Sequence, residues 1–176
     1  MAITFTNIVV GEGTLYIGNS APGTDVGATQ DGAEIAWEPD MVDIEVDQFG
    51  DAARVVQSMV KVTLKTKLAE GTLSNLLIAW NMPASKLTSG GGNNTFSIGI
   101  QSVYPQEKYL RLVGNAPGST ASVTKTRTYT CYRVVSYSSS SHMLKRSENV
   151  AFPIDFRILP DPQYTGAEYG TIVDQQ

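Results

Sequence analysis

Residues 60–68 read Val-Lys-Val-Thr-Leu-Lys-Thr-Lys-Leu, and apolar side chains alternate with polar ones along most of this stretch. Successive side chains of an extended chain point to opposite sides, so the pattern is typical of a strand with one buried face and one solvated face. The same alternation runs through residues 41–47 and 148–158. Three such stretches predict a mainly β domain of the β-sandwich or barrel-like kind.

Shorter runs of β-forming residues extend the prediction to the rest of the chain. We expect further strands at residues 3–10, 14–17, 33–38, 95–103, 109–113 and 122–137. Pro153 lies inside the 148–158 stretch and has no backbone N–H to donate, which indicates a sheet edge or a bulge at that position.

One segment has the spacing of a helix. Three apolar residues follow Leu73 at distances of three, four and seven positions: Leu76, Leu77 and Trp80. This spacing places all four on one face of a helix. Thr72 can cap the start and the proline at position 83 favours an end before it, so we expect a single short helix at about 72–81. Loops are expected at 18–32, 48–54, 85–94, 115–120 and 138–147, with a hairpin tip at the triple glycine 90–92.

The length and composition indicate one folded domain, residues 1–176. The chain has 41% hydrophobic residues and a single cysteine, Cys131, so it can bury a core but cannot form a disulfide within itself. No apolar run reaches the roughly 20 residues that span a bilayer, and the first ten residues lack the features of an export signal. We therefore expect a protein of a reducing compartment with no membrane partner.

Charge is segregated along the chain. Residues 1–54 carry ten acidic residues and one basic residue. Residues 55–146 carry two acidic and eleven basic residues, and the last thirty residues carry five acidic residues and one basic residue. Such blocks favour contacts between unlike segments, either within one chain or between copies. The basic residues are spread singly, which disfavours a nucleic-acid binding surface of the usual kind.

The sequence gives no indication of catalysis. His142 is the only histidine and lies in a serine-rich stretch, and neither a nucleophile triad nor a set of metal ligands is apparent from the spacing of His, Cys and acidic residues. Gly11-Glu12-Gly13 lacks the further glycine and the strand–helix context of a phosphate loop. We expect no enzymatic activity, no cofactor and no metal.

Two stretches together resemble a known family. The first runs from residues 42–46 through Ala52-Ala53-Arg54 and strand 60–68 to the segment 70–76, Glu-Gly-Thr-Leu-Ser-Asn-Leu. The second is residues 152–161, Phe-Pro-Ile-Asp-Phe-Arg-Ile-Leu-Pro-Asp, followed by residues 169–172. In this order they resemble the major tail tube proteins of long-tailed bacteriophages, over roughly residues 33–172.

The resemblance implies a fold and a function. It implies a long hairpin followed by a strand that ends at a glutamate, a short helix, and a C-terminal arm. It further implies six-membered rings with a continuous inner β-barrel, stacked head to tail into the hollow tail tube of a virion. Such a tube would conduct DNA into the host, and its other partners would be the tape measure protein and further tail proteins.

Asp43, Glu45 and Asp47 share one face of an expected strand and are the candidates for lining the lumen, since rings of carboxylates would repel DNA phosphates. Two alternatives remain open: a solvated outer face, or cross-strand pairing with Lys61, Lys65 and Lys67. The loops 18–32 and 48–54 and the C-terminal arm 164–176 are the expected contacts between subunits. Their candidate residues are Gln48, Phe49, Asp51, Arg54, Tyr169 and Ile172.

Two other functions fit the same sequence. One is the inner tube of a related contractile tail, type VI secretion system or gene-transfer particle. The other, from a different class, is a soluble β-sandwich binding module, such as a carbohydrate binder. A binding module would remain near the 19.0 kDa of one chain, whereas a tube protein would form rings or filaments.

Overall fold

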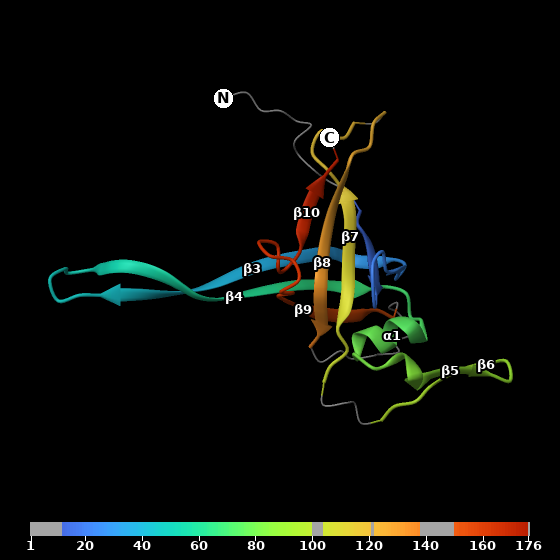
Figure 1. Cartoon of the computed structure of the whole chain (residues 1–176). Helices are drawn as coiled ribbons and strands as arrows, with labels where there is room; N and C mark the ends of the chain where they lie inside the picture. Colours follow the sequence, from blue (N-terminus) through green and yellow to red (C-terminus); the bar gives the residue numbers. More distant parts are fainter. Residues whose placement is uncertain (1–11, 100–103, 121, 138–149, 176) are drawn as a thin grey trace.

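The computed structural model describes residues 12–99, 104–120, 122–137 and 150–175. It is mainly β (Figure 1). Its strands are β1 (Thr14–Gly18), β2 (Thr24–Asp25), β3 (Thr29–Glu45), β4 (Ala52–Leu68), β5 (Leu87–Gly90), β6 (Asn93–Phe96), β7 (Lys108–Asn115), β8 (Thr126–Ser136), β9 (Phe152–Leu159) and β10 (Thr171–Asp174). The helix α1 (Leu73–Ala79) and the 3-10 turn η2 (Ala84–Lys86) lie between β4 and β5.

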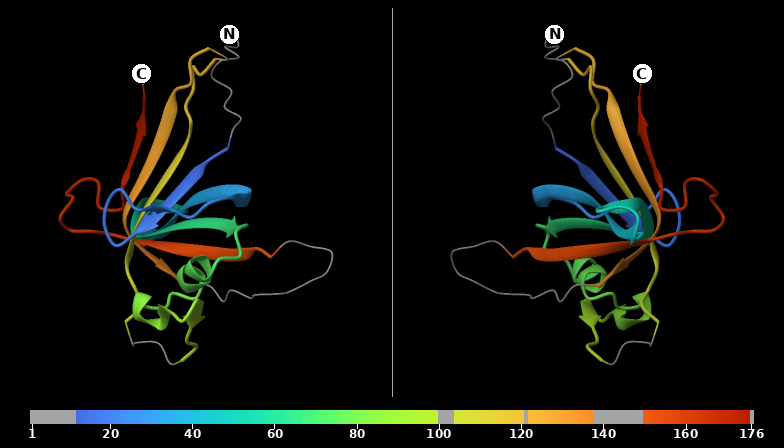
Figure 2. Two further views of the ribbon diagram at one scale, coloured as in Figure 1. Left: turned by 90° about the vertical axis from the view of Figure 1, so that its right-hand side faces the viewer. Right: turned by 90° about the vertical axis from the view of Figure 1, so that its left-hand side faces the viewer.

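One antiparallel sheet with the order β2-β1-β7-β8-β9-β4-β3 contains most of the strands. β8 lies at its centre: residues 126–134 pair with β7, residues 133–136 pair with β9, and residues 127–130 also pair with β10. Figures 1 and 2 show that β7, β8 and β10 cross β3, β4 and β9 at a steep angle. The sheet therefore bends into two layers, and the core lies between them.

The alternation read from the sequence produces this core. Leu64 and Leu68 of β4 and Ile154, Phe156 and Ile158 of β9 are buried. Their neighbours Lys65, Lys67, Asp155 and Arg157 point to the other side of the sheet, as the period of two requires. Burying aliphatic and aromatic side chains in this way is the main stabilisation of the fold.

The helix covers one end of the core. It begins after Thr72, whose hydroxyl accepts the N–H of Asn75 at 3.1 Å, as the sequence predicts. The buried side chain of Asn75 donates to the carbonyls of Val26 and Glu70, so the helix is tied to the loop before β3. None of the helices in the described part of the chain is long and apolar enough to cross a membrane.

Most of the expected elements are confirmed, with some changes of extent. Pro153 pairs only with Lys67 of β4, because β8 joins β9 from Phe156 onward, so the proline does lie at a local sheet edge. The triple glycine is the tip of the β5–β6 hairpin. The expected bounds of the strand at 95–103 are wrong, because the strand in this region, β6, ends at Phe96.

Three expected loops contain strand structure, and one of them, 85–94, includes β5 and the start of β6. The 18–32 segment includes β2 and the start of β3, and β4 already begins at Ala52, within the expected 48–54 loop. The C-terminal segment contains β10, which the sequence did not predict. The strand expected at 3–10 and the loop with His142 lie outside the described residues.

Candidate functional site

The most distinctive feature of the molecule is a projecting arm, which we define as residues 40–59. It is the outer part of the β3–β4 hairpin and extends far from the body (Figure 1). β4 gains a second partner, β9, only from Val62 onward, and β3 pairs with β4 alone. The arm is therefore a two-stranded ribbon that is exposed along almost its whole length.

The side of the β3–β4 ribbon that carries the apolar residues changes between the body and the arm. Near the body, Ile35 and Trp37 lie on the core side of β3, opposite Leu64 and Val62. Farther out, the positions of β3 that continue this side carry Asp43 and Glu45. The opposite side, which carries Glu34 and Glu38 near the body, carries Val42 and Ile44 on the arm.

A β-bulge makes β4 follow this exchange. Asp40 is opposite Met59 and Met41 is opposite Gln57, so Ser58 is an extra residue in β4. Its hydroxyl donates to the carbonyl of Asp40 at 3.2 Å. The extra residue shifts the alternation of β4 by one position and places Val56 directly across from Val42.

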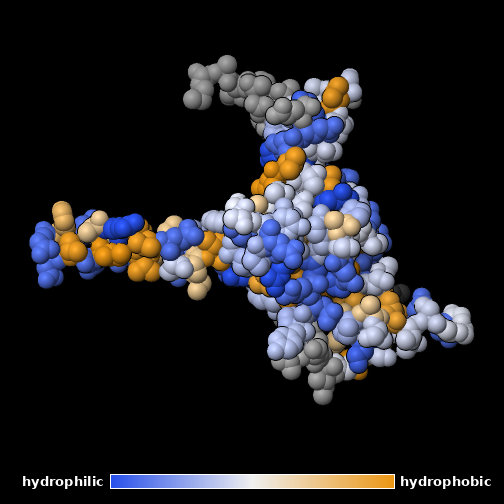
Figure 3. All heavy atoms as spheres, viewed as in Figure 1, coloured by the Kyte–Doolittle hydropathy of each residue, from blue (hydrophilic) through white to orange (hydrophobic). Residues whose placement is uncertain are grey.

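The arm thus has an apolar side and an acidic side. The apolar side carries the exposed residues Val42, Ile44, Val56 and Met59, with Asp40 and Arg54 among them. The acidic side carries Asp43 and Glu45, with Met41 and Val55 also exposed on it. Figure 3 shows the same gathering of hydrophobic residues along the arm, interleaved with hydrophilic ones. A surface of this kind has the composition of an interaction site rather than that of a solvated ribbon.

The net charge of the molecule resides on the arm. Positions 40–59 hold five of the 17 acidic residues and one of the 13 basic residues, a net charge of −4. Twelve acidic and twelve basic residues remain, so the rest of the chain sums to zero. The five acidic residues of the arm are Asp40, Asp43, Glu45, Asp47 and Asp51, and its basic residue is Arg54.

The candidate lumen residues lie on or beside the acidic side. Asp43 and Glu45 share one side of β3, opposite Val55 and Ala52, and Asp47 lies in the turn that follows. The alternative of cross-strand pairing with lysine is wrong within this chain. Lys61 pairs with Glu38 at 3.5 Å, Lys67 pairs with Asp31 at 2.6 Å, and Lys65 is opposite Glu34.

The end of the arm is a tight turn that presents an aromatic ring. The N–H of Phe49 donates to the carbonyl of Val46 at 3.0 Å, and the N–H of Ala52 donates to the carboxylate of Asp51 at 2.8 Å. Phe49 is 66% exposed. Of the other residues expected at subunit contacts, Gln48 lies in the same turn and Arg54 is opposite Ile44 on the apolar side.

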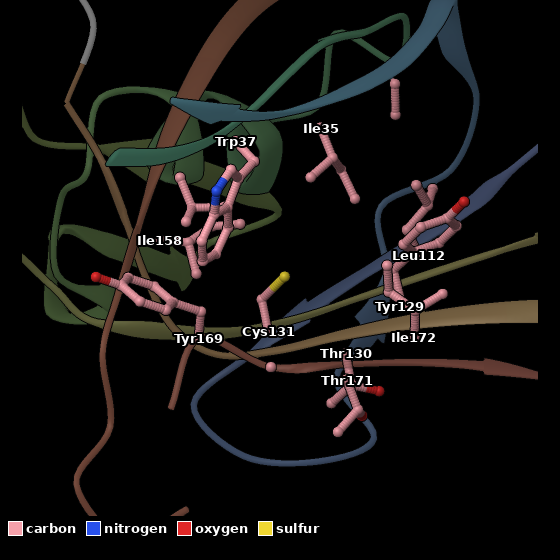
Figure 4. A pocket seen from close by; sticks show the side chains of 13 residues that line it. Ile35, Trp37, Leu112, Tyr129, Thr130, Cys131, Ile158, Tyr169, Thr171 and Ile172 are labelled. Carbon is pink, nitrogen blue, oxygen red and sulfur yellow. The ribbon is translucent and has the colours of Figure 1, made fainter. Parts of the chain in front are cut away.

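A pocket of about 470 Å³ opens at the base of the arm, between the two layers of the sheet. Trp37 and Cys131 both line this pocket, and the sulfur of Cys131 points into it (Figure 4). Trp37 meets Tyr169 edge to face, with 5.8 Å between the ring centroids. The remaining apolar lining comes mainly from Ile35, Val62, Leu112, Tyr129, Ile158 and Ile172.

The C-terminal segment forms one wall of this pocket. β10 pairs with β8, and the guanidinium of Arg127 makes two hydrogen bonds to the carboxylate of Asp174, one of them 2.6 Å long. This contact lowers the pKa of Asp174 below its ordinary value. Tyr169 packs against the core, whereas Ile172 is 65% exposed at the rim. Both expected contact residues therefore lie at the pocket.

The groups in the pocket favour apolar contact over chemistry. Burial raises the pKa of the Cys131 thiol to about 12, so the thiol is protonated at neutral pH and is a poor nucleophile. Among the described residues, no cluster of His, Cys, Asp and Glu is arranged to hold a metal ion. The arm and the pocket are both suited to burying apolar surface against another molecule.

Sequence reasoning found the acidic strand and the turn but missed the pocket. It also predicted that the apolar residues of the 41–47 strand are buried, which is wrong, because Val42 and Ile44 are exposed on the arm. The apolar side has a sequence signal: hydrophobic residues occupy odd positions at Ile35 and Trp37 and even positions at Val42 and Ile44. The pocket has none, because it depends on the bend of the sheet. The sequence matches no family model, and no curated protein matches it.

Proposed function

We propose that the protein is a structural subunit of a tube built from rings of identical copies, of the kind found in the tails of long-tailed bacteriophages. Six copies would form a ring, rings would stack head to tail, and the hollow tube would conduct DNA from the virion into the host. The tape measure protein and other tail proteins would be its further partners.

The observation that carries the proposal is the arm with its uncovered apolar side. A two-stranded ribbon is at best marginally stable in water, and it needs a third element against its apolar side to be held rigidly. The described part of the body places no element there. A surface of another copy is the simplest cover for a long exposed ribbon that every copy carries.

The geometry also favours open or ring-like assembly over a simple dimer. The arm and the rest of the molecule differ in shape and in charge, so an arm-to-body contact joins two different surfaces. Contacts between different surfaces repeat from copy to copy and generate rings or filaments, whereas a contact of one surface with itself stops at two copies.

The acidic side of the arm supports a passage role. A wall that faces DNA should repel phosphates, because each contact with a lysine or arginine adds affinity and slows passage. Asp43 and Glu45 lie on the other side of the arm from Val42 and Ile44, together with Met41 and Val55, so they would stay in water when the Val42 side is covered. Repeated in a ring, they would form a band of negative charge.

The decisive experiment is negative-stain microscopy of the purified protein at high concentration, together with light scattering. We expect rings or tubes with a central hole. Monomers of 19.0 kDa under every salt condition and concentration would contradict the proposal and would favour a soluble binding module instead. A related contractile or secretion tube would give similar particles and would be distinguished by the genes that surround this one.

A further inference from the structure

The end of the arm cannot reach the pocket of its own chain. Trp37 at the pocket and Glu45 at the far end of β3 belong to one continuous strand. A strand rises about 3.3 Å per residue, so these two positions are about 26 Å apart, and the turn with Phe49 lies farther still. The pocket and the ring of Phe49 therefore cannot meet within one extended copy.

A second arm is an unfavourable partner for the first. Each arm holds five carboxylates and one arginine. Two arms packed side to side would therefore bring together ten carboxylates and only two arginines. Like charges held close destabilise a contact. The rest of the molecule has no net charge and does not repel an approaching arm in this way.

The body offers the arm an apolar pocket with an exposed rim. Its volume of about 470 Å³ lies within the range of sites that enclose a ligand group. Trp37 is 58% exposed at one side of the opening, and Ile172 at the rim is more exposed still. Both side chains would lose contact with water if an aromatic ring entered between them, which is favourable for association.

We propose that the arm of one copy docks on the body of the next, with Phe49 filling the pocket between Trp37 and Ile172. Val42 and Ile44 would pack beside the pocket, and the acidic side would remain in water. Large aromatic residues in fitted pockets typically contribute most of the energy of such an interface. This inference rests on the proposed function, because it names the contact by which copies would join.

The test uses separate variants that disable either the arm half of the contact or the pocket half. Phe49→Ser removes the ring from an exposed turn. Ala33→Trp places a large side chain at an exposed position that lines the pocket, and Ile172→Asp is a second acceptor variant that puts a carboxylate at the rim. Ile98→Ser is the matched control, because it removes an exposed apolar side chain that belongs to neither surface.

Each variant alone should remain monomeric, while the Ile98→Ser control should assemble like the unmodified protein. An equimolar mixture of Phe49→Ser and Ala33→Trp should form a complex of twice 19.0 kDa and stop there. The reason is that the first retains an open pocket and the second an intact arm. Size-exclusion chromatography with light scattering measures both results, and thermal unfolding checks that each variant is folded.

Several outcomes would overturn the inference. Tubes formed by either pocket variant would show that the arm docks elsewhere, and the proposed tube function would still stand. Failure of the two folded variants to pair in the mixture would have the same meaning. If the unmodified protein never assembles under any condition, the proposed function itself fails, and this contact fails with it.

Discussion

Gly170 shows how one residue holds the C-terminal strand in place. Its φ of 143° lies in the region that favours glycine, and a Cβ at this position would collide with the carbonyl oxygen of Thr130. Gly170→Ala should therefore push β10 away from β8 and lower the free energy of unfolding by about 1–3 kcal/mol. Denaturant unfolding measures the change.

Gly166 provides the control for this prediction. It also has a positive φ, of 82°, but nothing lies within reach of an added Cβ. Gly166→Ala should carry the backbone strain without the collision and should leave β10 attached, as hydrogen exchange of residues 171–174 would report. Equal loss of β10 protection in the two variants would show that the close approach to Thr130 does not fix the strand.

The Asp174 carboxylate predicts a pH response of the same strand. Its hydrogen bonds to Arg127 lower its pKa in the folded protein below the ordinary value of 3.8. A lowered pKa means that the contact stabilises β10 at neutral pH and is lost as the pH falls below about 3.8 and through the folded value. Protection of the β10 amides should fall in that range.

Asp174→Asn isolates the contribution of this carboxylate. The variant should show weaker protection of β10 at neutral pH and little further loss below pH 4, measured against the unmodified protein at each pH. A parallel acid response in both proteins would assign the effect to other carboxylates. One of these is Glu107, whose pKa is lowered by its hydrogen bonds to Arg133.

At the scale of the element, the helix depends on its first hydrogen bond. Thr72→Ala leaves the N–H of Asn75 without its acceptor and should lower the free energy of unfolding by about 1 kcal/mol. Thr72→Ser keeps the hydroxyl and should cost much less. Chemical denaturation of the three proteins checks the order, and an alanine variant as stable as the serine variant would contradict a capping role.

The sequence predicts those elements whose own residues determine them. Strand β9 and helix α1 were predictable because apolar residues recur with a period of two in one and with helical spacing in the other. β10 was not, since Thr171–Asp174 is short and its pairing depends on Arg127 and on the glycine before it.

The same distinction applies to the candidate site. The acidic residues of β3 could be found from their spacing, because a strand places alternate side chains together wherever it lies. That Asp43 and Glu45 do not face the lysines of β4 could not be predicted, since the register that joins Lys61 to Glu38 follows from the whole hairpin and its bulges. The pocket needs the bend of the sheet, which no local pattern encodes.

At the scale of the whole molecule, reversing the acidic charges separates assembly from passage. Replacing Asp43, Glu45 and Asp47 with lysine changes the arm from −4 to +2, because three charges of −1 become three of +1. Solvated substitutions usually alter the free energy of unfolding by no more than about 0.5 kcal/mol each, so folding and tube formation should persist. DNA passage should slow, and added salt should relieve the effect.

Microscopy of the particles and their infection titre measure the two halves of this prediction. Normal tubes with reduced delivery would support the lumen assignment. Loss of tubes would place these carboxylates at a contact between copies, and normal tubes with normal delivery would mean that another surface lines the passage.

The uneven placement of charge on the molecule also bears on its colloidal behaviour before assembly. Proteins with no net charge tend to associate and precipitate, whereas a surplus of carboxylates keeps them dispersed. Here the body is electroneutral and the arm supplies the entire surplus. The arm therefore supplies the charge that keeps dilute copies of the free subunit apart. If the arm docks on a second copy as proposed, part of this charge would be covered, and further copies should add more easily to an assembly that has already begun to form.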